Sequence, residues 1–67
     1  MTSTFAAAKS SAIAAAIQSA PAGIKLRALV TRAAYNVGYF GDAAMMASVE
    51  ADLEGFTAEV RAARKAA

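Results

Sequence analysis

The clearest hydrophobic pattern lies in the C-terminal third of the chain. Apolar residues recur there at alternating spacings of three and four, at Met46, Val49, Leu53, Phe56, Val60 and Ala63. This is the spacing of a helix that packs one face against other helices. Asp42 precedes the pattern as a candidate N-cap. We therefore predict a helix over about 42–65, which is too short for a free-standing coiled coil and suits a bundle or a short oligomer interface.

Gly55 is the one residue in this segment that disfavours a helix. Glycine costs about 1 kcal/mol relative to alanine in a helix interior, so its presence needs a structural reason. A close contact or a bend near Gly55 would supply one.

The N-terminal third predicts a second helix, over about 4–18. Ser3 or Thr4 can cap its start, and Pro21 ends it. One face carries bulky residues together with alanines four residues apart: Phe5, Ile13, Ile17, Ala8, Ala12 and Ala16. Small side chains at this spacing let another backbone approach closely. We expect this helix to form a close pair with a neighbour.

The middle of the chain predicts a helix over about 22–37, with Gly38 placed to end it in the left-handed conformation. This helix has two apolar sides, one with Leu26, Val30, Ala33 and Val37 and the other with Ile24, Ala28 and Tyr35. A polar ridge between them carries Lys25, Arg32 and Asn36. Two apolar sides need two neighbours. The helix is therefore either the centre of a bundle or has one side free as a docking surface.

Together these patterns predict an all-α fold in a single domain over 1–67, either a small three-helix bundle or a helical hairpin with an additional N-terminal helix. Alanine occupies 21 of the 67 positions and favours helix over strand. A chain this short has a marginal core, and it contains no cysteine or histidine that could staple it. Assembly with a second copy or with another protein is the remaining route to stability.

The charges are segregated along the sequence. The net charge is only +2, but all five acids lie at or after Asp42. The segment before Asp42 carries four bases and no acid, giving +4 there and −2 in the rest; its bases are Lys9, Lys25, Arg27 and Arg32. The two parts can neutralise one another within a bundle or dimer. Alternatively, the basic part can bind phosphates, with Tyr35, Tyr39 or Phe40 stacking on bases.

The residue inventory argues against catalysis and against cofactor or metal binding. The usual nucleophiles and bases, cysteine and histidine, are missing, and the serines lie in no catalytic motif. Glu50 and Glu54 lie four apart on one face of the predicted helix, as in a solvated surface rather than an acid and base pair. Gly38 and Gly41 match neither phosphate-binding glycine motif. We expect no enzyme, no cofactor and no metal site.

No segment predicts a membrane span, because the longest uncharged run, 10–24, contains a glutamine, three serines and a proline. Lys9, the apolar stretch 12–17 and the small residues 20–22 loosely imitate a secretory leader. That stretch is short and dominated by alanine, so we expect a cytoplasmic protein. The alanine-rich, arginine-containing composition is typical of genomes of high GC content, including those of phages, and leaves host or phage origin open.

The aromatic residues give the best candidate for a binding surface. Tyr39 and Phe40 are expected in a turn between two helices, where they either cap the end of the bundle or form an exposed anchor. The predicted partner-binding residues are Arg27, Arg32, Tyr35, Tyr39 and Phe40. The sequence thus favours a helical protein–protein interaction module, acting as an accessory or assembly subunit or as an inhibitor that occludes a larger protein. The alternative is a nucleic-acid-binding accessory protein that uses the basic N-terminal part.

Overall fold

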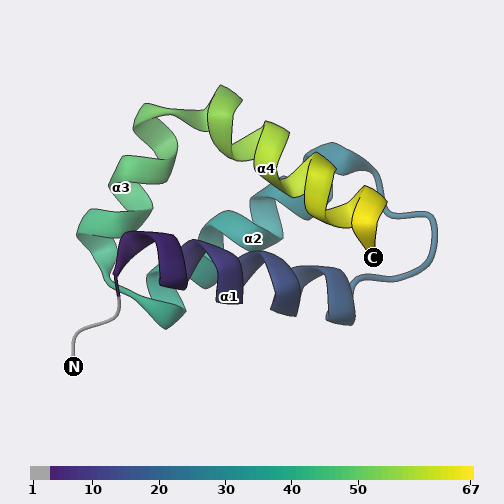
Figure 1. Ribbon diagram of the computed structural model, residues 1–67, viewed down its shortest axis with the longest axis horizontal. Coiled ribbons are helices and arrows are strands. Elements are labelled where there is room, and N and C mark those ends of the chain that lie inside the picture. Colours follow the sequence, from purple (N-terminus) through teal and green to yellow (C-terminus); the bar gives the residue numbers. More distant parts are fainter. Residues whose placement is uncertain (1–3) are drawn as a thin grey trace.

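The computed structural model describes residues 4–67, which fold as an all-α bundle and contain no strand. Its helices are α1 (Phe5–Ser19), α2 (Leu26–Phe40), α3 (Ala43–Ala51) and α4 (Leu53–Ala66). α1 and α2 run side by side in opposite directions, α3 follows the end of α2, and α4 returns toward the start of α2 (Figure 1). The predicted fold class is confirmed.

α1 agrees closely with its prediction. The hydroxyl of Thr4 accepts a hydrogen bond from the amide of Ala7 at 3.1 Å and caps the helix, whereas Ser3 lies outside the described residues. Ala8, Ala12 and Ala16 are fully buried, and α1 packs most extensively against α2. The expected close helix pair is therefore present.

α2 begins and ends later than the sequence predicts. Pro21 to Ile24 form a turn in which the Ile24 amide donates to the Pro21 carbonyl, and Gly23 has a φ of 79° that favours glycine. At the other end, the prediction that Gly38 closes the helix is wrong, because the helix continues to Phe40. Gly38 instead allows a close approach: a Cβ there would lie 3.1 Å from Sδ of Met46 in α3.

The helix predicted over 42–65 is two helices that meet at Asp52. Its start is confirmed, since Asp42 accepts a hydrogen bond from the amide of Met45 at 2.8 Å. Asp52 then leaves the helical conformation, with φ −134° and ψ 61°, and its carboxylate accepts from the amide of Gly55 at 3.2 Å to cap α4. A Cβ on Gly55 would collide with this carboxylate. The bend expected near Gly55 thus occurs three residues earlier, at the cap that the glycine accommodates.

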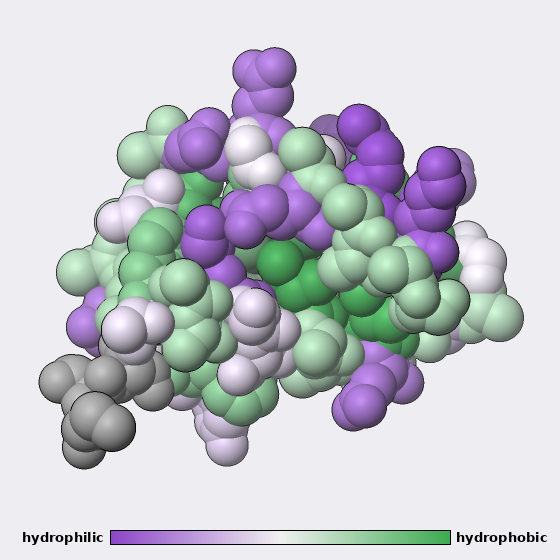
Figure 2. All heavy atoms as spheres, viewed as in Figure 1, coloured by the Kyte–Doolittle hydropathy of each residue, from purple (hydrophilic) through white to green (hydrophobic). Residues whose placement is uncertain are grey.

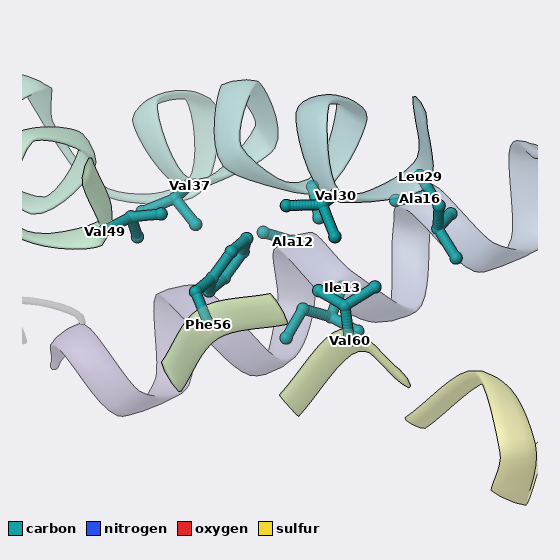
Figure 3. Packing of buried hydrophobic residues seen from close by; sticks show 10 residues of the cluster. Ala12, Ile13, Ala16, Leu29, Val30, Val37, Val49, Phe56 and Val60 are labelled. Atoms are coloured by element: carbon teal, nitrogen blue, oxygen red, sulfur yellow. The ribbon is translucent and has the colours of Figure 1, made fainter. Parts of the chain in front are cut away.

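The core lies where α4 crosses the pair of α1 and α2. Phe56 of α4 points toward Ala12, and Val60 lies beside Ile13 (Figure 3). Val49 of α3 is also buried, so three members of the predicted apolar seam are in the core. Leu53 is not, because the break at Asp52 turns it outward and leaves it 50% exposed. For this residue the predicted core position is wrong.

Candidate functional site

An open groove lies between α2, α3 and α4, with a volume of about 660 Å³. We call it the α2/α3/α4 groove. Most of its lining is apolar or aliphatic. The lining residues are Leu26, Arg27, Val30, Thr31, Ala34, Tyr35, Met46, Glu50, Leu53 and Thr57.

The groove follows from the geometry of α2 and from the break at Asp52. Leu26, Val30 and Ala34 are four residues apart, so they form one row along α2. Leu53 stands on the opposite wall, half exposed, at the first residue of α4. Tyr35, which is 68% exposed, lines the groove from the outer side of α2. Apolar groups thus remain accessible on two facing walls.

Two opposite charges line this apolar surface, Arg27 on α2 and Glu50 on α3. Neither side chain forms an ion pair within residues 4–67. Within residues 4–67, the one ion pair joins the ammonium of Lys9 on α1 to the carboxylate of Glu59 on α4, at 3.0 Å. Arg27 and Glu50 are therefore available to charges brought by an occupant of the groove.

The structure brings together only part of the predicted binding surface. Arg27 and Tyr35 both line the groove. Arg32 does not, because its guanidinium points toward α1 and donates to the carbonyl of Ser19 at 3.5 Å. Tyr39 and Phe40 lie in the last turn of α2 rather than in a turn between helices. Their rings contact edge to face, with centroids 5.2 Å apart.

Of the two alternatives for these aromatics, capping of the bundle by packing over its core is wrong for Tyr39, which is 82% exposed. Phe40 is 39% exposed, and its ring contacts the ring of Tyr39. Neither residue lines the α2/α3/α4 groove. They form a separate exposed feature at the C-terminal end of α2.

Several groove residues were not predicted as binding residues. Met46 and Leu53 were assigned to the core by their spacing, and Leu53 reaches the groove only because of the break at Asp52. Thr31, Glu50 and Thr57 line the groove without any sequence signal of their own. The sequence signal for the break is Asp52 followed three residues later by Gly55. An aspartate that caps the start of one helix interrupts the helix before it, and this turns Leu53 toward the groove.

Three of the four basic residues proposed for phosphate binding do not form one patch. The ammonium of Lys9 binds Glu59 and lies 4.7 Å from the centre of the Phe5 ring. Arg27 faces the groove, whereas Arg32 faces α1. The cations therefore point to different sides of the bundle.

A second, shallower hollow lies between α1 and α4. It is lined mainly by Ile13, Ile17 and alanines of both helices, with Glu59 on its edge. Figure 2 looks onto α1 and shows strongly hydrophobic residues in a hollow near the centre of this face, with hydrophilic residues above it and weakly hydrophobic residues to its right. The hollow between α1 and α4 is lined by one charged residue, Glu59, and by no base, unlike the α2/α3/α4 groove.

The described residues contain no cluster of acids that could hold a metal ion, and none of the helices over 5–66 is long and apolar enough to cross a membrane. Glu50 and Glu54, expected on one helix face, belong to different helices because of the break at Asp52. Comparison with family models, with curated proteins and with solved structures gave no match to this chain. The groove is the feature on which a function can be argued.

Proposed function

We propose that this chain is a protein–protein interaction module, serving as an accessory or assembly subunit, and that the α2/α3/α4 groove receives a helix of the protein partner. The observation that carries the proposal is the exposure of Leu53 and Tyr35 on facing walls of an apolar groove. Amphipathic helices commonly dock in such grooves through apolar anchors at successive turns. An inhibitor that occludes a larger protein would use the same surface.

The geometry favours a protein partner over a nucleic acid. A nucleic-acid surface needs cations that line one path along the phosphates. Here Lys9 is paired with Glu59, and Arg27 shares the groove with Glu50, whose carboxylate repels phosphate. An apolar groove with one base and one acid matches a protein surface better.

Site-specific photocrosslinking in cells of the source organism would test this function. A benzophenone amino acid is placed at Thr31, which lines the groove, and in a matched control at Ala6, which is exposed on α1. We expect covalent adducts with protein from position 31 and none above background from position 6. Equal yields from the two positions would contradict the proposal.

A second substitution links those adducts to the groove itself. Leu53→Asp places a charge where an apolar anchor would be buried, whereas Leu53→Met keeps an apolar side chain of similar volume. Docking would bury the exposed half of Leu53, and the carboxylate of Leu53→Asp would in addition lose its water, a combined cost of about 1.5 kcal/mol or more that corresponds to about tenfold or more in affinity. We expect the adducts from position 31 to fall about tenfold or more with Leu53→Asp and to persist with Leu53→Met.

A further inference from the structure

We propose that the purified protein is a two-fold symmetric dimer in which a second copy of this chain occupies the α2/α3/α4 groove. The inference rests on the proposed function, because it takes the groove to be a protein-docking surface. It adds the identity of an occupant. Charge complementarity within the groove carries the argument.

The groove contains both members of a charge pair but does not pair them. Arg27 and Glu50 lie on different walls, and neither has an ion-pair partner in the described part of the chain. In a two-fold interface, the contact of residue i with residue j occurs twice. A second copy therefore brings its Glu50 to Arg27 and its Arg27 to Glu50, so that one symmetric arrangement satisfies both charges.

The apolar groups of the groove fit the same arrangement. Leu53 projects from one wall, and the partly exposed Leu26 and Ala34 lie on the other, one turn to either side of the buried Val30. Around a two-fold axis, Leu53 of each copy meets the α2 row of its partner. A standard interface buries about 800 Å² per partner, which is less than a fifth of the 4505 Å² surface of this chain, so one face of the bundle is enough.

The thin core explains why such an association would be favoured. Four of the buried side chains are alanines, namely Ala8, Ala12, Ala16 and Ala33. Alanine buries little apolar area compared with leucine or phenylalanine. The chain also has no cysteine for a disulfide. Covering the groove adds apolar burial that a single chain lacks.

Sedimentation velocity and multi-angle light scattering on the full chain would test the dimer through charge reversal. Arg27→Glu places two acids opposite each other at both symmetric contacts, and Glu50→Arg does the same with two bases. We expect each single variant to dimerise at least about tenfold more weakly than the unmodified chain. The double variant Arg27→Glu/Glu50→Arg restores both opposite-charge contacts and should dimerise again.

Mixing the two single variants gives the sharpest outcome. In a heterodimer of Arg27→Glu with Glu50→Arg, both contacts again join an acid and a base. We therefore expect a heterodimer from two chains that each pair only weakly with themselves. Lys25→Glu and Glu54→Arg carry the same charge changes at exposed positions that do not line the groove, and both should leave the dimer intact. Circular dichroism of every variant checks that the helices are retained.

The outcomes separate this inference from the proposed function. A chain that stays monomeric up to about 1 mM, where specific association would be very weak, overturns the dimer. A dimer that is insensitive to both charge reversals uses another face and also overturns it. In either case the proposed function still stands if the benzophenone at position 31 captures a different protein in cells. It fails if position 31 captures no more than position 6.

Discussion

The two sides of α2 are packed in different ways. On the side of α1, the facing residues are the buried alanines Ala12 and Ala16, and the helices are close enough for Asn36 of α2 to donate to the Ala12 carbonyl at 3.2 Å. On the side of α3 and α4, Met46 lies close to Gly38, and an apolar groove remains open beside it.

This difference shows how side-chain size and helix continuity divide one small bundle into two halves. We call the contact of α1 with α2 the closed half, and the groove between α2, α3 and α4 the open half. Small residues on α1 bring two backbones together along their length. The break at Asp52 instead turns Leu53 away from the core and leaves an accessible wall. The closed half holds the fold together, and the open half is the surface proposed for docking.

The largest effect should come from the core residue that joins the two halves. Phe56 is buried, and Phe56→Ala should cost about 3–5 kcal/mol. A domain of 67 residues has a total stability of about 3–10 kcal/mol, so this substitution should remove a large part of it. Leu53→Ala, three residues earlier, should cost under about 1 kcal/mol because its side chain is half exposed.

Urea unfolding followed by circular dichroism would measure both free energies. Both substitutions would be made in the Arg27→Glu variant, in which dimerisation through the groove is weakened. The cost measured for Leu53→Ala then reports folding alone and not loss of the dimer. Similar costs for the two substitutions would mean that Leu53 belongs to the core and that the groove is closed in solution.

The next effect tests the closed half. Ala12 is fully buried between α1 and α2, so Ala12→Leu should overpack this contact and cost about 1–3 kcal/mol. Ala6→Leu adds the same atoms at an exposed position of α1 and should change stability by less than about 0.5 kcal/mol. Thermal unfolding of the two variants would measure the difference. Equal melting temperatures would contradict the close helix pair.

The closed half could be predicted from the sequence because its signals are local. The Thr4 cap and the alanines four residues apart belong to a single helix, and their consequences do not depend on distant parts of the chain. Arg27 and Tyr35 are predicted binding residues that line the groove, but that they contact a partner stays a prediction.

The open half could not be predicted in the same way because its causes are not local. The role of Gly38 depends on Met46, which belongs to another helix. The apolar spacing from Val49 to Phe56 continues through the break, so periodicity alone does not show it. Only the competition of the Asp52 side chain for backbone amides reveals that Leu53 faces outward.

A smaller effect tests this break directly. Asp52→Ala removes the cap of α4 and should cost about 1 kcal/mol. Gly55→Ala should change little on its own, because the gain of about 1 kcal/mol in helix propensity is offset by displacement of the Asp52 carboxylate. In the Asp52→Ala background that conflict is absent, and Gly55→Ala should stabilise by about 1 kcal/mol. Additive effects in this double-mutant cycle would show that glycine is not there to accommodate the cap.

The smallest effect concerns the ion pair that joins the basic and acidic parts of the sequence. The side chain of Glu59 is about half accessible to water, so its coupling to Lys9 should be under about 1 kcal/mol and should fall at high salt. Lys9→Met should cost more than Glu59→Gln, because the ammonium also lies over the ring of Phe5. A double-mutant cycle in low and high salt would measure the coupling. A coupling energy of zero at both salt concentrations would mean that the Lys9–Glu59 pair does not stabilise the fold. The separation of bases and acids along the sequence would then act only through charges such as Arg27 and Glu50, which have no ion-pair partner within the described residues.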